Sequence, residues 1–96
     1  MGWTENIYAP SERVIYREIA DEALLVPVHG DIADMQSLYA LNSVGRYVWL
    51  RLDGRQRTGE IVGGVCRAFA VDPAQAEADV RSFLDELLQA DLITEV

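Results

Sequence analysis

The apolar residues of this chain change their spacing once, at Asn42, and that change limits the folds open to the sequence. The stretch 37–54, SLYALNSVGRYVWLRLDG, begins with an uncharged, proline-free run up to Leu41, which is typical of a strand. Directly after it, Val48 and Leu52 lie at helical spacing, and Asn42 is a favoured helix N-cap. Strand patterns precede this point and helical patterns follow it, so the sequence predicts the α+β class.

Two further strands are predicted ahead of residue 37. Residues 14–19 are β-branched and aromatic, residues 23–28 are apolar, and the short polar segment between them predicts a hairpin. Pro27 has no N–H to donate, which places its end of the strand at an edge or a bulge. A polar connection, residues 29–36, leads to the third strand, 37–41, and the three strands are expected to form an antiparallel sheet.

Three helices are predicted to follow the sheet. The first ends near Gly54, and the second runs from Thr58, as N-cap, to about Phe69. Gly63 and Gly64 lie inside the second helix, where we expect close approach by another backbone to compensate for their low helix propensity. The third helix runs from the start signal Asp72-Pro73 to about residue 90.

The size of the chain sets its organisation. With 96 residues, half of them hydrophobic, it has room for one domain and one core. We expect a loose N-terminal segment over residues 1–13 and a folded domain over residues 14–96. No apolar stretch is long enough to span a bilayer, and the N-terminus lacks the pattern of a signal peptide. A single cysteine, Cys66, fits a reducing compartment, so we expect a cytoplasmic protein.

Charge narrows the choice of partner. Eight arginines stand against sixteen acidic residues, which gives a formal net charge of −8. Such a chain repels phosphate backbones, which disfavours general nucleic-acid binding. Arg46, Arg51, Arg55 and Arg57 cluster on and after the first helix, where they either balance helix-end charge or form a docking patch for an acidic partner.

No catalytic constellation is visible. His29 is the only histidine; with Asp31 and Asp34 it falls short of the four ligands of a structural metal site, so we interpret these as turn residues. Cys66 has apolar neighbours on its helix and is interpreted as a small buried hydrophobe. We therefore expect no enzyme activity, no catalytic residue, no cofactor and no metal. Trp49 is assigned to the flank of the core or to a partner contact, and Trp3 is left unassigned.

The order of motifs from the third strand onward resembles one known family. Residues 39–54 (Tyr-x-Leu-Asn, then x-Val-Gly-x-x-Val-Trp-x-x-Leu-Asp-Gly) are similar to the strand-to-helix motif of the PqqD family, named after pyrroloquinoline quinone biosynthesis. Residues 58–62 are similar to its second helix and residues 71–87 to its third. The resemblance extends from about residue 14 to residue 93. The same module is known as the RiPP recognition element.

The resemblance implies a winged helix-turn-helix-like fold without catalytic residues. Members of the family bind the leader of a ribosomally synthesised precursor peptide and deliver it to a modifying enzyme, often a radical SAM enzyme. The leader adds as a strand along the third strand, in a groove against the third helix, by β-augmentation. The expected peptide-binding residues are Ser37, Leu38, Tyr39, Ala40, Leu41, Val80, Arg81, Leu84 and Leu87. Arg81 is the expected partner of an acidic leader side chain, and Val80, Leu84 and Leu87 are alternatively core.

Other functions stay open at this point. A winged-helix DNA-binding protein shares the fold class, and a structural docking subunit of an enzyme complex would need no peptide. The connection 29–36 is longer than the short acidic-glycine turn common in the family, so its position beside the groove is undetermined. The expected partners are a leader peptide and a modifying enzyme, and neither nucleic acid nor a membrane is expected. A homodimer is also compatible with the sequence. The final product, whether a quinone cofactor, a lasso peptide or another, does not follow from the sequence.

Overall fold

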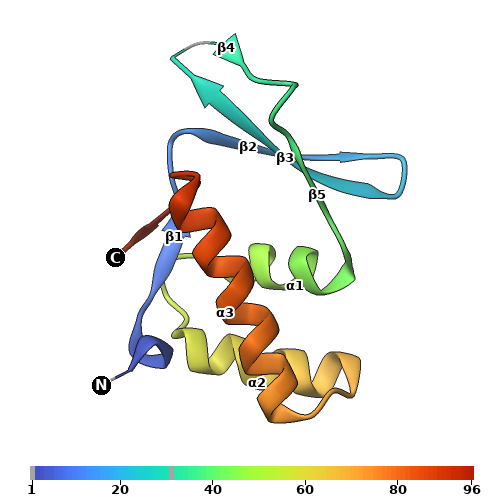
Figure 1. The fold of residues 1–96 in the computed structure, drawn as a ribbon, viewed down its shortest axis with the longest axis vertical. Coiled ribbons are helices and arrows are strands. Elements are labelled where there is room, and N and C mark those ends of the chain that lie inside the picture. The colour runs from blue at the N-terminus through green and yellow to red at the C-terminus, as the bar shows by residue number, and fades with distance from the viewer. Residues whose placement is uncertain (1, 31) are drawn as a thin grey trace.

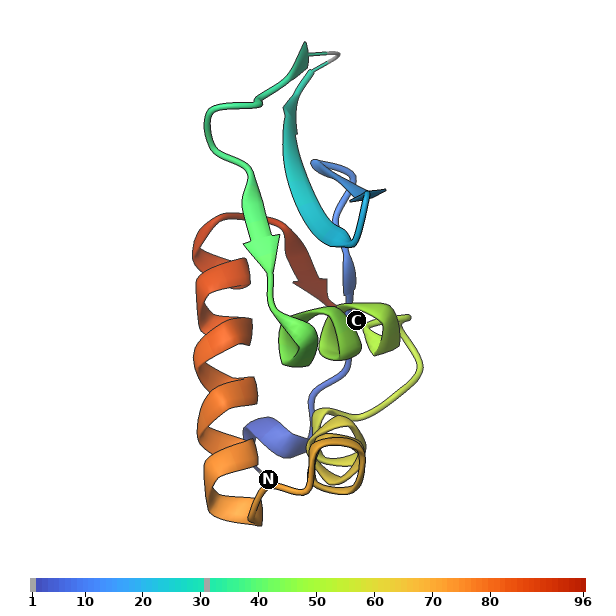
Figure 2. The ribbon, with the colours of Figure 1, turned by 90° about the vertical axis from the view of Figure 1, so that its right-hand side faces the viewer.

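The four-stranded sheet forms one end of the molecule and the helices form the other (Figure 1). The structure is a computed structural model that describes residues 2–30 and 32–96. Figure 1 shows the sheet of β2, β3, β4 and β5 above the helices, and Figure 2 shows β5 and α3 on the same side of the molecule. The elements in chain order are η1 Trp3–Glu5, β1 Tyr8–Pro10, β2 Val14–Ile19, β3 Glu22–His29, β4 Ile32–Ala33, β5 Tyr39–Leu41, α1 Ser43–Arg51, α2 Thr58–Phe69, α3 Pro73–Gln89 and β6 Ile93–Glu95.

β3 is the centre of the main sheet. β2 pairs antiparallel with β3 along its whole length, from Val14 opposite Pro27 to Ile19 opposite Glu22. On its other edge, β3 pairs with β5 through residues 23–25 and with the two-residue β4 through residues 28 and 29. The predicted antiparallel arrangement of three strands is confirmed, and β4 adds a fourth, short strand within the connection 29–36.

All three helices begin close to the expected residues. The Asn42 side chain accepts a hydrogen bond from the Gly45 N–H at 2.8 Å, and the Asp72 side chain accepts from Ala74 and Gln75. Both predicted N-caps are therefore confirmed. The N-cap of α2 is Arg57 rather than Thr58, because the Thr58 hydroxyl donates to the Asn6 carbonyl instead.

The N-terminal segment, expected to be loose over residues 1–13, packs onto the domain. β1 pairs antiparallel with β6 at the C-terminal end of the chain, with Ala9 opposite Thr94. The two Thr58 donors, its N–H and its hydroxyl, both bond the Asn6 carbonyl, at 2.9 and 2.8 Å. Tyr8 is 7% exposed and belongs to the core. Backbone pairing between the two ends of the chain therefore orders this segment; Met1 lies outside the described residues.

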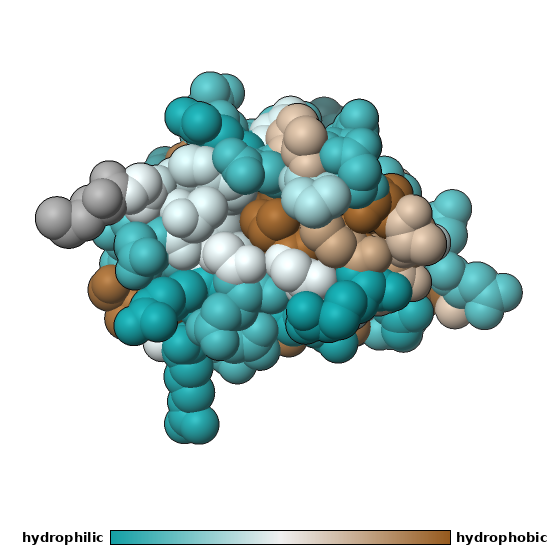
Figure 3. Space-filling model, turned by 90° about the horizontal axis from the view of Figure 1, so that it is seen from below, coloured by the Kyte–Doolittle hydropathy of each residue, from teal (hydrophilic) through white to brown (hydrophobic). Residues whose placement is uncertain are grey.

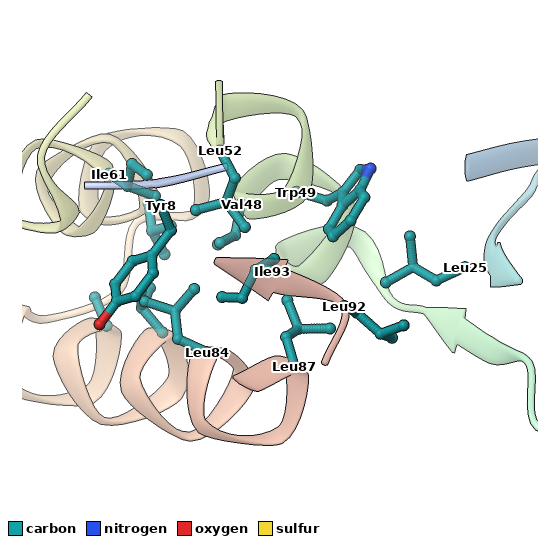
Figure 4. Close-up of a cluster of buried hydrophobic side chains, with 13 residues drawn as sticks. Tyr8, Leu25, Val48, Trp49, Leu52, Ile61, Leu84, Leu87, Leu92 and Ile93 are labelled. Atoms are coloured by element: carbon teal, nitrogen blue, oxygen red, sulfur yellow. The ribbon is translucent and has the colours of Figure 1, made fainter. Parts of the chain in front are cut away.

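The core lies between the helices and the two-stranded β1–β6 sheet. Val48 of α1 and Leu52, the C-cap of that helix, meet Leu84 and Leu87 from α3, with Ile93 of β6 between them (Figure 4). Trp49 is 6% exposed, so its side chain is part of the core. Trp3 is half-buried against the same cluster.

The face of the molecule on which α2 lies is mostly polar (Figure 3). Figure 3, seen from the side on which α2 lies, shows hydrophilic side chains surrounding a smaller hydrophobic area. None of the described helices is both long enough and apolar enough to cross a membrane.

Candidate functional site

β5 is an edge strand of the sheet. It pairs with β3 on one side, and among the described residues no strand pairs with its other side. The strand contains Tyr39, Ala40 and Leu41, with no charged residue and no proline. An edge of this kind normally carries a lysine, a proline or a covering element, because its free backbone groups can pair with another chain.

Two hydrogen bonds made by β3 show which of its backbone groups face β2 and which face the side of β4 and β5. The Val28 N–H donates to the Arg13 carbonyl on the β2 side, at 2.8 Å, and the Asp34 N–H donates to the Pro27 carbonyl on the β4 side, at 2.7 Å. Successive residues of a strand direct their N–H and C=O to alternate edges. In β3, Ala23 and Leu25 therefore share the direction of Pro27, toward β5.

The register then fixes the orientation of β5. Leu41 lies opposite Ala23, Ala40 opposite Leu24, and Tyr39 opposite Leu25. Tyr39 and Leu41 thus direct their backbone groups inward, toward β3. The N–H and C=O of Ala40 point outward, to the free edge.

A groove of about 350 Å³ lies along this free edge, between β5 and α3. Its lining residues come from β5, the start of α1 and one side of α3: Tyr39, Ala40, Leu41, Asn42, Val44, Gly45, Val48, Asp79, Ser82, Phe83 and Glu86. A smaller hollow of about 240 Å³, which shares Tyr39 and Glu86, continues the groove toward the C-terminal end of α3.

The groove is apolar within and polar at its rim. Val44 and Phe83 are half-buried, and Val48 beneath them is fully buried. Asp79 and Glu86 are exposed on α3 beside them. The combination of a free strand edge with an apolar trough suits an extended chain that pairs through its backbone and inserts alternate side chains.

Only part of the expected third strand is a strand. Ser37 and Leu38 precede β5, because a turn occupies this part of the chain. The Asp34 carboxylate accepts hydrogen bonds from the Ser37 hydroxyl and from the Gln36 N–H, and these bonds lower the pKa of Asp34. Such side-chain bonds to the following backbone compete with strand pairing.

Three expected groove residues lie elsewhere. Val80, Leu84 and Leu87 are 0%, 2% and 0% exposed, and they belong to the hydrophobic core rather than line the groove. Figure 4 shows Leu84 and Leu87 within that core. These three residues lie on the apolar side of α3 that faces the core, since burial against α1 and α2 needs the most hydrophobic side of the helix.

Arg81 also lies away from the groove. Its guanidinium carbon is 5.7 Å from the ring centre of Trp3, next to η1. Arg81 is about 140° around the helix from Glu86, because successive helical residues are about 100° apart. It therefore faces the opposite flank of α3 from the groove.

Sequence reasoning missed the residues of α3 that do form the groove wall. Asp79, Ser82, Phe83 and Glu86 follow the spacing i, i+3, i+4, i+7, which marks one side of a helix. Two of the four are acidic, which is typical of the solvent-facing side of a helix. Phe83 is the residue from which the sequence could have indicated this wall. It is an aromatic residue beside the core-facing side of α3, and in the sequence it lies between the two acidic residues.

The other candidate chemical groups are dispersed. His29 Nε2 lies 3.3 Å from Asp34 Oδ2 at the exposed end of β3, and Asp31 is outside the described residues. Within residues 2–30 and 32–96, no three His, Cys, Asp or Glu side chains gather as a metal site would require. Cys66, expected to be buried, is only partly buried, because it lies on the flank of α2.

Two of three comparisons with known proteins find a match, one to a solved structure and one to a protein family. A search of curated protein sequences finds no match. The solved structure "TbiB1 in Complex with the TbiA(beta) Leader Peptide" matches with a TM-score of 0.72 and 29% sequence identity, over 88% of this chain and 93% of that one. The sequence profile of the family described as "Coenzyme PQQ synthesis protein D (PqqD)" matches residues 22–93. That match includes the main sheet from β3 onward and all three helices, so the chain belongs to the PqqD family.

Proposed function

We propose that this protein is a non-catalytic chaperone for a ribosomally synthesised precursor peptide. It binds the leader segment by β-augmentation along β5 and delivers the precursor to a modifying enzyme. The observation that carries this proposal is that the N–H and C=O of Ala40 point to the free edge of β5, directly beside the groove. Membership of the PqqD family and the likeness to TbiB1, whose structure contains a leader peptide, support it.

The length of β5 determines how much of the binding free energy comes from backbone hydrogen bonds and how much from side chains in the groove. A strand of three residues offers one outward residue, Ala40, and therefore one pair of backbone bonds at its centre. Each such bond contributes about 1 kcal/mol net, which is too little for a stable complex. Most of the affinity must therefore come from leader side chains in the groove against Phe83 and Val44.

Delivery requires a second partner. We propose a modifying enzyme such as a radical SAM protein, because the PqqD family to which the chain belongs delivers precursor peptides to such enzymes. We place the complex in the cytoplasm, where precursor peptides are made by ribosomes and a lone cysteine stays reduced.

Amide hydrogen exchange tests the binding mode directly. The probe is the leader half of a precursor peptide encoded beside the gene, and a scrambled peptide of equal composition is the control. In the free protein, we expect the Ala40 amide to exchange quickly and the Tyr39 and Leu41 amides to be protected. Leader binding should protect Ala40, while the scrambled peptide should not. Protection confined to another edge, such as β2, would contradict the proposal.

A pair of substitutions on α3 tests the groove. Phe83→Ala removes the aromatic wall and should weaken leader binding by about 1–3 kcal/mol. Leu88→Ala is the matched control, since Leu88 is 36% exposed and does not line the groove. Thermal melting of both variants confirms that they are folded before isothermal titration with the leader. Equal losses of affinity in the two variants would exclude the groove as the binding site.

A further inference from the structure

The wall of the groove carries a charge pattern that constrains which peptides it accepts. Asp79 and Glu86 stand on either side of Phe83 on α3, and the residues lining the groove and its extension include no arginine. The two acidic residues are seven positions apart, about 10 Å along the helix axis. A bound strand therefore passes two carboxylates with an apolar patch between them.

Nearby cations do not neutralise these carboxylates. Arg46, on α1, is engaged by Glu18, with Nη2 at 3.0 Å from both carboxylate oxygens, and by the Tyr16 hydroxyl. Arg81 lies on the opposite flank of α3, over Trp3. Within residues 2–30 and 32–96, the one side chain that donates to Asp79 is the neutral Gln75 amide, at 2.8 Å. The net charge of −8 gives the whole protein a field of the same sign.

The pairing geometry decides which leader side chains meet this wall. Directly opposite residues in a ladder share a face, so leader residues opposite Tyr39 and Leu41 point toward the groove, and the one opposite Ala40 points away. Inward-pointing side chains are two residues, or about 7 Å, apart. When one of them packs against Phe83, the next along the strand comes within reach of Asp79 or Glu86, given the length of a lysine or arginine side chain.

We infer that the peptide recognised by this protein is cationic: it carries a lysine or arginine two residues from an apolar side chain, on the face that enters the groove. This inference rests on the proposed function and specifies its substrate class. It reverses the charge expected from the sequence, where Arg81 was paired with an acidic leader residue. An acidic side chain in the groove would face Asp79 or Glu86 without a compensating cation and would be disfavoured.

A peptide selection tests the charge preference. The probe is a display library of random 12-residue peptides, from which peptides that bind the unmodified protein are selected. Two matched variants each remove two carboxylates from α3. Asp79→Asn/Glu86→Gln changes the groove wall, whereas Glu77→Gln/Asp85→Asn changes exposed positions that do not line the groove. Chemical shifts of the Ala40 amide show whether each selected peptide binds at β5.

The expected result is enrichment of peptides with a lysine or arginine two residues from an apolar residue. The groove variant should bind these peptides about three- to tenfold more weakly, while the control variant should bind them like the unmodified protein. Raising the salt concentration should weaken binding to the unmodified protein more than to the groove variant. Selected peptides that shift Ala40 but are neutral or acidic would overturn the charge inference and leave the proposed function standing. Selected peptides that leave Ala40 unaffected would overturn both.

Discussion

Gly64 shows how one missing side chain shapes the packing of α1 on α2. A Cβ placed there would collide with the hydroxyl of Tyr47 and lie 3.2 Å from its ring. A Cβ placed at the neighbouring Gly63 would meet only Nη1 of the Arg67 guanidinium, at 3.5 Å, among the described residues. The close approach expected from the two glycines therefore exists at Gly64, where the partner is a tyrosine side chain rather than a backbone.

This difference predicts opposite effects for two alanine substitutions. Gly64→Ala should lower the free energy of unfolding by about 1–3 kcal/mol, because the Tyr47 ring must move. Gly63→Ala should raise it by about 0.5–1 kcal/mol, because alanine is the better helix former. Urea unfolding of both variants measures the contrast. Equal effects of the two substitutions would show that Tyr47 does not pack on Gly64 as described.

Glu18 links β2 to α1 and predicts a pH dependence. The Tyr16 hydroxyl donates to its carboxylate at 2.6 Å and Arg46 donates to both oxygens; these bonds hold the pKa of Glu18 below its ordinary value of 4.5. A carboxyl whose pKa is lowered by folding stabilises the protein above its unfolded pKa, and this contribution is lost as the pH falls through the folded value. Glu18→Gln should therefore be less stable than the unmodified protein at pH 7.

The stability gap between Glu18→Gln and the unmodified protein should close on acidification below about pH 4. Urea unfolding at pH 7 and pH 3 provides the comparison. Because the network is exposed, the gap at pH 7 should be small. A gap that is unchanged at pH 3 would mean that the carboxylate charge is not what stabilises this contact.

At the scale of elements, the pairing of β1 with β6 makes the N-terminal segment part of the fold. Tyr8 is 7% exposed, and its hydroxyl accepts a hydrogen bond from the Asn6 side chain at 3.0 Å. Tyr8→Ala should therefore cost about 3–5 kcal/mol of stability through the cavity it leaves, as for other large core side chains. Tyr8→Phe keeps the ring and loses only the hydrogen bond, so it should cost about 1 kcal/mol. A negligible change in Tyr8→Ala by thermal melting would restore the view of a loose N-terminal segment.

The sequence predicts elements well where the signal is local. Asn42 and Asp72 cap the helices that they were expected to cap, since a cap depends on residues two or three positions away. β1, β4 and β6 have only two or three residues each, and β1 pairs with β6 across almost the whole chain. Strands this short carry little pattern of their own, so their pairing could not be predicted.

The candidate site was predicted on the strand but not on the helix. Tyr39, Ala40 and Leu41 line the groove as expected, because a bare, uncharged strand is visible in the sequence. On α3, apolar residues at helical spacing mark the side of the helix that is buried. This pattern therefore indicates core residues such as Val80 and Leu84 and not the groove wall. The groove wall lies on the adjoining flank, where acidic residues cannot be distinguished from an ordinary solvated surface.

At the scale of the whole molecule, the net charge of −8 argues against DNA binding by this winged helix-turn-helix-like fold. Of the eight arginines, Arg46, Arg13 and Arg57 are each within 4 Å of a carboxylate, which reduces the cation available to phosphate. We expect no complex with duplex DNA at micromolar protein and physiological salt. Fluorescence anisotropy with labelled DNA checks this, and a salt-sensitive complex would favour the DNA-binding alternative.

The central claim is that a leader strand pairs with the outward N–H and C=O of Ala40, and paired proline substitutions test it most directly. Tyr39→Pro removes an N–H that faces β3, so thermal melting should show a destabilised domain. Ala40→Pro removes only the outward N–H, so the domain should melt close to the unmodified protein. Ala40→Val keeps the N–H and controls for the change in side chain.

Titration of the folded Ala40→Pro variant with the leader peptide is the deciding measurement. The account predicts that binding weakens by about 1–3 kcal/mol, because one hydrogen bond is lost and a leader carbonyl is left unpaired, while Ala40→Val binds nearly normally. A folded Ala40→Pro variant that binds the leader as tightly as the unmodified protein would contradict strand addition at β5.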